Sequence, residues 1–124
     1  MDELPVKQAL RLTKETQDVD TLIELTRHSD AVVRQRALKE MCPCRVHGDI
    51  AAFWKRLFEV AVTDPAAIVR RQALHNMCDG SPPHLELKIA EALDEFNRDR
   101  DPLIRRMAHK ALTAYRKTGK WNVL

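Results

Sequence analysis

An internal repeat with a period of 35 to 36 residues constrains the fold of this chain more than any other feature. The segment Val33–Ala37 returns 36 positions later as Val69–Ala73, and after a further 35 positions as Ile104–Ala108. In each copy an aliphatic residue precedes arginine, and alanine follows the arginine by three positions. A motif that returns at one such period indicates structural units that stack on their neighbours and share a continuous core.

Each period has the apolar spacing of two helices. In the second unit, apolar residues recur at i, i+3, i+4, i+7 and i+8 from Ile50 to Phe58, continuing to Ala61 and Val62. This is one stripe of an amphipathic helix, and we expect Trp54 and Phe58 to be core residues at the centre of the chain. The inward residues of the other predicted helices are Val6, Ala9, Leu10, Thr13, Leu22, Ile23, Leu25, Val33, Ala37, Met41, Val69, Ala73, Met77, Leu85, Ile89, Leu93, Phe96, Ile104, Ala108, Leu112 and Tyr115.

Turn residues divide the chain into units. Asp64-Pro65 and Asp101-Pro102 are typical of an N-cap followed by proline at the first helical position, and Gly119 is expected to end the last helix. The sequence predicts one all-α domain, a right-handed α-solenoid of about seven helices. Its parts are an N-terminal capping helix within 1–17, helix pairs over 18–47, 48–80 and 81–118, and a tail over 119–124.

The order of acidic turn, proline, aliphatic residue, arginine and alanine resembles the HEAT repeat, particularly the short HEAT-like units of phycobilisome-lyase-type proteins. The resemblance extends over about residues 18–118. It implies an α-solenoid. Because HEAT-like proteins are mostly scaffolds and adaptors, it also implies a non-catalytic interaction module, although a minority of such proteins bind nucleic acid or act as enzymes.

The repeated arginines follow acidic turn residues by four or six positions. Stacking would align these charges as a ladder in which each arginine reaches an aspartate of its own or the neighbouring turn. The HEAT resemblance implies the same structural role, and the alternative is that the arginines line a binding groove. The predicted ladder consists of Asp30, Arg34, Asp64, Arg70, Asp101 and Arg105.

Charge is distributed unevenly. Residues 1–30 hold seven acids and four bases, whereas residues 98–120 hold eight bases and two acids. We expect the concave face, formed by the second helices, to bind a protein partner with an acidic surface. Sequence-tolerant binding of RNA or DNA through the same face is the alternative, although only Tyr115 and Trp121 are nearby to stack on bases. The candidate binding residues are Arg36, Arg71, Arg106, Lys110, Arg116, Lys117 and Lys120.

Metal and catalytic sites find less support. Cys42, Cys44 and His47 could bind zinc with Cys78, His75 or His84, but a C-x-C spacing lacks the usual two-residue turn. Cys42 and Cys78 also occupy equivalent repeat positions and are expected to be buried. Catalysis by Cys44 with His47, or by Glu91, Asp94 and Glu95, lacks an orienting residue. The chain is therefore predicted to be neither an enzyme nor a metal or cofactor protein.

The cysteines and the tail allow two further expectations. Three cysteines, an odd number, favour a reducing, cytoplasmic location, and no apolar run approaches the roughly 18 residues of a membrane span. Trp121 and Leu124 are expected to fold back near Phe96 and Tyr115, which gives a monomer. The alternative is that they dock onto a second copy as a dimer.

Overall fold

The computed structural model describes residues 3–42, 50–79 and 81–119, and all regular structure in these ranges is helical. Seven α-helices and one short 3-10 helix are present there, and no strand. The prediction of an all-α chain is thereby confirmed. The helices are α1 (Val6–Glu15), α2 (Val19–Leu25), α3 (Ala31–Glu40), α4 (Ala51–Thr63), α5 (Ala67–Met77), η1 (Pro83–Leu85), α6 (Glu86–Phe96) and α7 (Pro102–Thr118).

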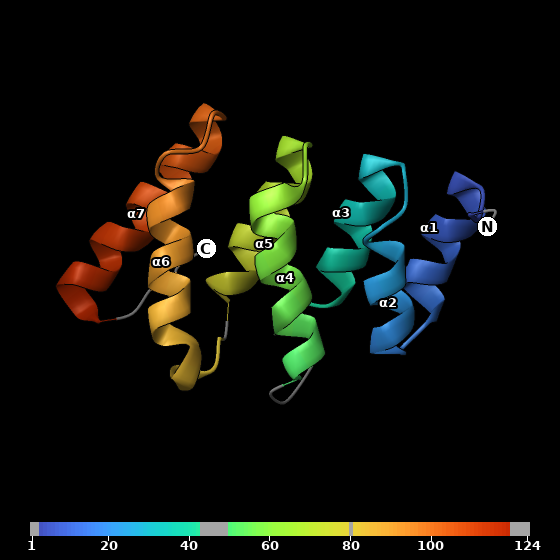
Figure 1. The fold of residues 1–124 in the computed structure, drawn as a ribbon, viewed down its shortest axis with the longest axis horizontal. Helices are drawn as coiled ribbons and strands as arrows, with labels where there is room; N and C mark the ends of the chain where they lie inside the picture. Colours follow the sequence, from blue (N-terminus) through green and yellow to red (C-terminus); the bar gives the residue numbers. More distant parts are fainter. Residues whose placement is uncertain (1–2, 43–49, 80, 120–124) are drawn as a thin grey trace.

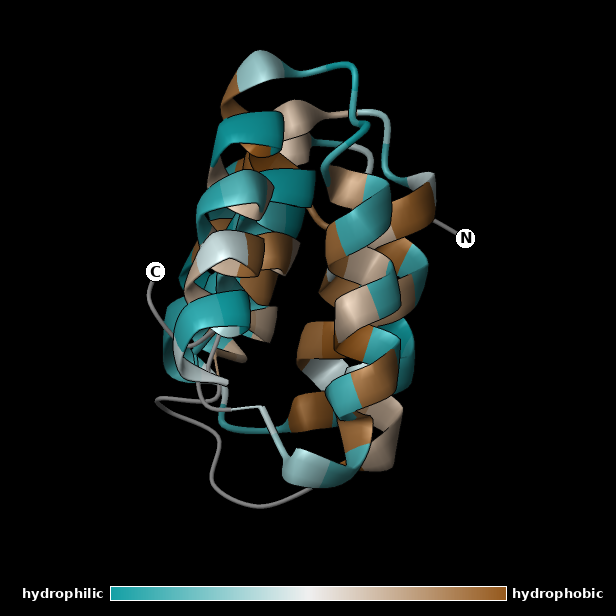
Figure 2. Ribbon diagram, turned by 90° about the vertical axis from the view of Figure 1, so that its left-hand side faces the viewer, coloured by the Kyte–Doolittle hydropathy of each residue, from teal (hydrophilic) through white to brown (hydrophobic). Residues whose placement is uncertain are grey.

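The helices follow one another in a row with two layers (Figure 1). One layer contains the first helices, α2, α4 and α6, and the other contains the second helices, α3, α5 and α7. Each first helix packs on the second helix that follows it, while α3 packs on α5 and α5 on α7. Helix α1 packs against α2 and α3 at one end of the row. The two layers lie side by side when the row is viewed from its α7 end (Figure 2).

The core lies between the layers and repeats with the sequence. The aliphatic residues that precede the repeated arginines, Val33, Val69 and Ile104, are completely buried. The alanines that follow them are also completely buried, and their small side chains let the layers approach closely. Trp54 is only 5% exposed, and its ring centroid lies 5.0 Å from that of Phe53. The indole is therefore a central part of the core, as the sequence predicted.

The end of the apolar stripe on α4 differs from the expectation. Val62 is 78% exposed, and Phe58 is only partly buried, whereas Val60 is buried. The reason is that α4 and α6 are set apart, so only the side of α4 that faces the second layer is covered. Val60 follows Leu57 by three positions and shares that covered side. Phe58 packs at the rim of the core rather than in its centre.

The predicted N-cap role of Asp64 is wrong. Helix α5 begins at Ala67 with Ala66 as its N-cap, and the Asp64 carboxylate accepts a hydrogen bond from the Ala66 amide at 2.9 Å. Asp64 instead lies at the C-terminal end of α4, and its carboxylate accepts hydrogen bonds from Arg34 of the preceding unit. Asp101 caps α7 as predicted, and Asp30 caps α3.

At the other end of α7, Gly119 adopts the left-handed conformation, with φ of 74°, that commonly ends a helix. Lys120, Trp121 and Leu124 lie outside the described residues, so the expected docking of the tail stays a prediction.

Replacing Trp54 with alanine tests its place in the core. We expect the free energy of unfolding to fall by about 3–5 kcal/mol, because truncation of a buried aromatic leaves a cavity. Val62→Ala on the same helix is the control and should change stability by less than about 0.5 kcal/mol, because its side chain is exposed. Urea denaturation followed by circular dichroism measures both. Equal losses in the two variants would contradict the assigned orientation of α4.

Candidate functional site

Arginines of the second helices join each unit to the next. Arg34 donates from Nε to Oδ2 of Asp64 at 2.8 Å and from Nη2 to Oδ1 of the same carboxylate at 3.1 Å. Its Nη1 donates to the backbone carbonyls of His28 at 3.0 Å and Ser29 at 2.8 Å. One guanidinium thus fastens its own turn and the turn of the following unit, with the bidentate geometry that arginine and carboxylate favour.

Arg70 repeats this arrangement one unit later. Its Nε and Nη2 both donate to the Asp99 carboxylate at 3.0 Å, and its Nη1 donates to the Asp64 carbonyl at 3.0 Å. Arg105 donates to the Asp99 carbonyl at 2.8 Å. Among the described residues, Arg105 has no carboxylate partner. For Arg34, Arg70 and Arg105 alike, an accepting carbonyl lies six positions earlier in the chain.

The aspartate partner of Arg70 was not among the predicted ladder residues. Asp99 precedes Arg105 by six positions, as Asp64 precedes Arg70, and this matched spacing is a signal that the sequence contained. Asp30 and Asp101 serve as helix caps instead. Asp101 also lies 3.9 Å from Nε of Arg71.

The electrostatic environment of Asp99 follows from this pairing. Burial by itself would raise the pKa of its carboxyl group. Hydrogen bonds from Arg70 and from the Asp101 amide outweigh burial, and the positive charge of Arg70 adds to them, so the pKa of Asp99 is lowered.

Loss of the buried ladder arginine should destabilise the chain far more than loss of the terminal one. The side chains of Arg70 and Asp99 are 6% and 11% exposed, so Arg70→Met leaves a buried carboxylate unpaired, and we expect a loss of about 3 kcal/mol or more. Arg105→Met is the matched control. It removes one hydrogen bond at an exposed side chain and should cost at most about 1 kcal/mol. Chemical denaturation of both variants decides this, and similar losses would refute the ladder as the dominant inter-unit contact.

The lowered pKa of Asp99 predicts how stability depends on pH. Because the folded pKa lies below the ordinary value of 3.8, ionised Asp99 contributes its full stabilisation above that pH. The contribution is lost as the pH falls through the folded pKa. Asp99→Asn should therefore be less stable at neutral pH and should lose stability less steeply below pH 3.8 than the parent chain. Denaturation at a series of acidic pH values measures the slopes, with Glu91→Gln as control, and parallel curves for Asp99→Asn and the parent would contradict the assignment.

The exposed side of the second helices carries rows of equivalent residues. Val32, Ile68 and Leu103 occupy the same repeat position and are 45%, 38% and 37% exposed. Seven positions after each of them stands a basic residue, and this spacing places it on the same helix face. These basic residues are Lys39, His75 and Lys110. The aliphatic row was missed in the sequence, although the same shifts that align the arginines also align it.

The predicted binding residues are not all equally available on this face. Arg36, Arg106 and Lys110 are exposed, and so are Arg116 and Lys117 in the last turn of α7. Arg71 is only partly exposed, and its Nε is buried beside Asp101 without a hydrogen bond to any described residue. The repeat equivalent of Arg36 is Gln72, which belongs to a hydrogen-bonded network with Gln35 and Asn76.

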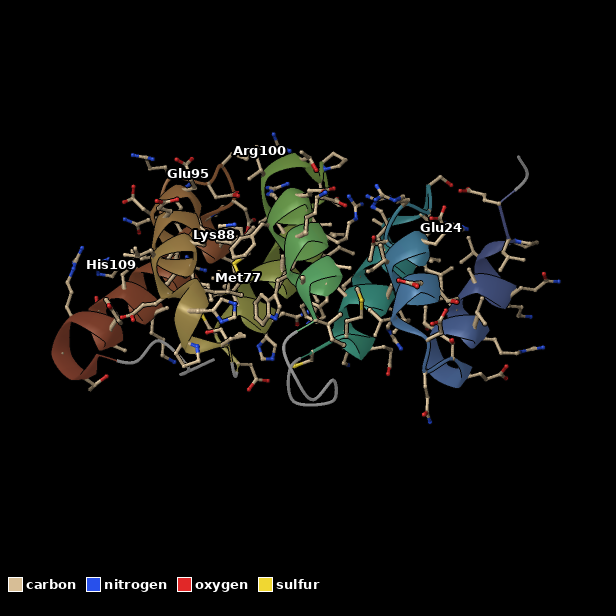
Figure 3. The ribbon with its side chains drawn as sticks, turned by 60° about the horizontal axis from the view of Figure 1, so that its bottom comes forward. Glu24, Met77, Lys88, Glu95, Arg100 and His109 are labelled. Atoms are coloured by element: carbon tan, nitrogen blue, oxygen red, sulfur yellow. The ribbon has the colours of Figure 1, made fainter. Side chains whose placement is uncertain are left out.

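The outer side of α7 carries a polar residue at a repeat position that is apolar in α3 and α5. Leu38 and Leu74 are completely buried between neighbouring second helices, and the equivalent residue of α7 is the exposed His109, labelled in Figure 3. His109 lines a shallow pocket of about 510 Å³ with Asn97, Pro102, Arg105, Arg106 and Lys110. This side therefore does not require another apolar helix to cover it.

A groove of about 1310 Å³ runs between α4 and α6 in the first-helix layer. Trp54 and Phe58 line it, and Nζ of Lys88 lies 6.0 Å from the centroid of the Phe58 ring. At one end, Arg100 donates to the Pro65 carbonyl at 3.0 Å. Lys88, Glu95 and Arg100 are labelled in Figure 3.

The acids considered for catalysis border the same groove. Arg98 lies 3.4 Å from Asp94 and 2.8 Å from Glu95, and all three side chains are largely exposed. Their arrangement is that of charge pairs on the solvated face of a helix.

The cysteines and histidines that were weighed as metal ligands separate into two groups. Cys42 lies beside His75 and Asp79 at the ends of α3 and α5. His84 lines the groove in the other layer, and Cys78 is completely buried. Burial raises the pKa of the Cys78 thiol to about 12. Cys44 and His47 lie outside the described residues.

Comparison with known families, with curated proteins and with solved structures found no match to this chain. None of the described helices combines the length and the apolar character needed to cross a membrane.

Proposed function

We propose that the chain is a right-handed α-solenoid of HEAT-like units that acts as a non-catalytic scaffold. Its binding surface is the second-helix face, defined by the aliphatic row Val32, Ile68 and Leu103 and by the cations Arg36, Lys39, Arg106 and Lys110. The partner is a protein segment that carries acidic and aliphatic side chains together. The two-layer row of helices supports the solenoid, and the repetition of the arginine–aspartate contact in successive units supports a regular stack.

The observation that carries this function is the exposed aliphatic row. Three large apolar side chains at one repeat position are each more than a third exposed. A row of aliphatic side chains beside a row of cations is complementary to a partner of mixed character. The apolar side chains of such a partner pack on the aliphatic row, and its carboxylates pair with the cations.

A nucleic-acid backbone would use the cations but would gain little from the aliphatic row, since phosphate contacts are electrostatic. Aromatic side chains for stacking are also few on this face. The phenol of Tyr115 donates a hydrogen bond to Glu86 of α6. The aliphatic row therefore favours a protein partner over RNA or DNA.

Binding to designed probes tests the second-helix face. We would measure by fluorescence anisotropy the affinity for a labelled peptide of alternating Glu and Leu. The comparison probes are a Glu and Ser peptide of equal charge and a single-stranded RNA. We expect the Glu and Leu peptide to bind most tightly. Val32→Ser with Leu103→Ser, and separately Lys39→Glu with Lys110→Glu, should each weaken it at least about tenfold, or about 1.4 kcal/mol.

Matched controls lie on the first-helix layer. Val62 and Leu87 are 78% and 79% exposed, so Val62→Ser with Leu87→Ser changes more accessible apolar surface on the other layer and should leave binding unchanged. Lys55→Glu on α4 is the corresponding charge control. Preferential binding of RNA, with a steep loss in salt and no effect of the aliphatic substitutions, would establish the nucleic-acid alternative. Equal binding by the control variants and the second-helix variants would contradict the assignment to this face, and loss in the controls alone would assign the function to the groove.

We also propose that the chain is a cytoplasmic monomer. A cytoplasmic monomer is consistent with a scaffold whose described cysteines, Cys42 and Cys78, are both outside disulfides.

A further inference from the structure

We propose that Cys42, His75 and Asp79 form a binding site for Zn²⁺ where α3 and α5 end. His75 lies in the last turn of α5, whereas Cys42 and Asp79 lie just beyond the ends of α3 and α5, and the three ligand atoms all lie within 4.8 Å of one another. Sγ of Cys42 lies 3.0 Å from Oδ2 of Asp79, and Nε2 of His75 lies 3.7 Å from the same oxygen. Thiolate, imidazole and carboxylate are the three side-chain ligands that Zn²⁺ uses in proteins.

Two of the three separations between ligand atoms are close to those of a zinc site, and all three are within 4.8 Å. Zinc binds sulfur at about 2.3 Å and nitrogen or oxygen at about 2.0–2.2 Å, so tetrahedral ligand atoms lie about 3.5 Å apart. The observed distances of 3.0 and 3.7 Å lie on either side of this value. Small rotations of exposed side chains would complete the geometry, since the His75 and Asp79 side chains are 40% and 37% exposed. The same exposure gives the ion a path to the site and lets water complete its coordination.

Local structure also favours a cation here. Cys42 follows the C-terminus of α3, and His75 belongs to the last turn of α5. Helix C-termini carry partial negative charge, which stabilises a cation near them. Asp79 lies just beyond the C-cap of α5, and its Oδ2 lies 3.7 Å from Nε2 of His75. When Zn²⁺ binds, the Cys42 thiol releases its proton to solvent as the sulfur–zinc bond forms.

The repeat supplies an internal comparison. Cys78 is the equivalent of Cys42, but the residues of α7 equivalent to His75 and Asp79 are Lys110 and Ala114. Within the described part of the chain, metal-ligating groups converge around Cys42 and not around Cys78. The unit around Cys78 therefore lacks both the imidazole and the carboxylate. The C-x-C spacing of Cys42 and Cys44 led us to predict no metal site. The structure instead brings Cys42 together with His75 and Asp79, near the ends of two helices.

Metal titration of the full chain tests the site. After treatment with a chelator, the chain should bind one equivalent of Co²⁺ with a thiolate-to-cobalt charge-transfer band, and added Zn²⁺ should displace the Co²⁺. Cys42→Ser should abolish the band. His75→Asn and Asp79→Asn, at half-exposed positions that folding tolerates, should each weaken binding by more than about tenfold. Cys78→Ser is the matched control and should retain the band and the affinity.

Folding is checked separately from metal binding. Zn²⁺ should raise the melting temperature of the parent chain, because an ion bound only by the folded state stabilises it, and should not raise that of Cys42→Ser. The site is overturned if the parent chain shows no thiolate band, if Cys42→Ser keeps it, or if His75→Asn and Asp79→Asn bind as tightly as the parent. Binding of the acidic peptide is measured on the same variants, so failure of the metal site and failure of the second-helix face are distinguishable.

Discussion

The buried arginine–aspartate pairs hold this structure together from unit to unit. Arg34 and Arg70 each bind a carboxylate of the following unit through two hydrogen bonds and a carbonyl of their own turn through a third nitrogen. Such a pair adds little to the free energy of unfolding relative to apolar residues packed in the same place. Removal of one member, however, leaves a buried charge unpaired and destabilises the fold. The contact therefore determines how one unit is positioned on the next, while burial of the aliphatic and alanine residues supplies the stabilising free energy.

Regular spacing of the units has consequences on both layers. On the second-helix side, equivalent residues line up, so Val32, Ile68 and Leu103 form a row beside a row of cations. The same register places Cys42 beside Asp79, which follows Cys78, the repeat equivalent of Cys42, in the chain. On the other side, α4 and α6 are set apart, and the space between them is the groove at Trp54 and Phe58. The N-terminal end departs from this pattern. His28 occupies the repeat position of Asp64 and Asp99, and its ring contacts the Leu4 carbonyl. Glu3 accepts a hydrogen bond from the Ser29 amide.

Much of the fold could be predicted from periodicity alone. The repeat identified the helix pairs and the buried positions around Val33, Val69 and Ile104, because burial in a stack repeats whenever the sequence does. The turn residues also identified Asp101 at the start of α7, whereas Asp30, which was predicted for the ladder, caps α3. The expectations failed where a side chain had two competing uses. Asp64 resembles an N-cap in sequence, yet its carboxylate pairs with an arginine 30 positions away. The repeat placed Asp64 in the ladder, whereas the local Asp-Pro spacing suggested a cap.

The sequence by itself determined an all-helical chain, its repeat and the unequal distribution of its charges, since these depend on local spacing and composition. Only the tertiary structure decided which aspartate each arginine binds, which cations remain exposed, and that Cys42 meets His75 and Asp79. Those outcomes depend on the distance and rotation between neighbouring units, which are set by packing across the layers.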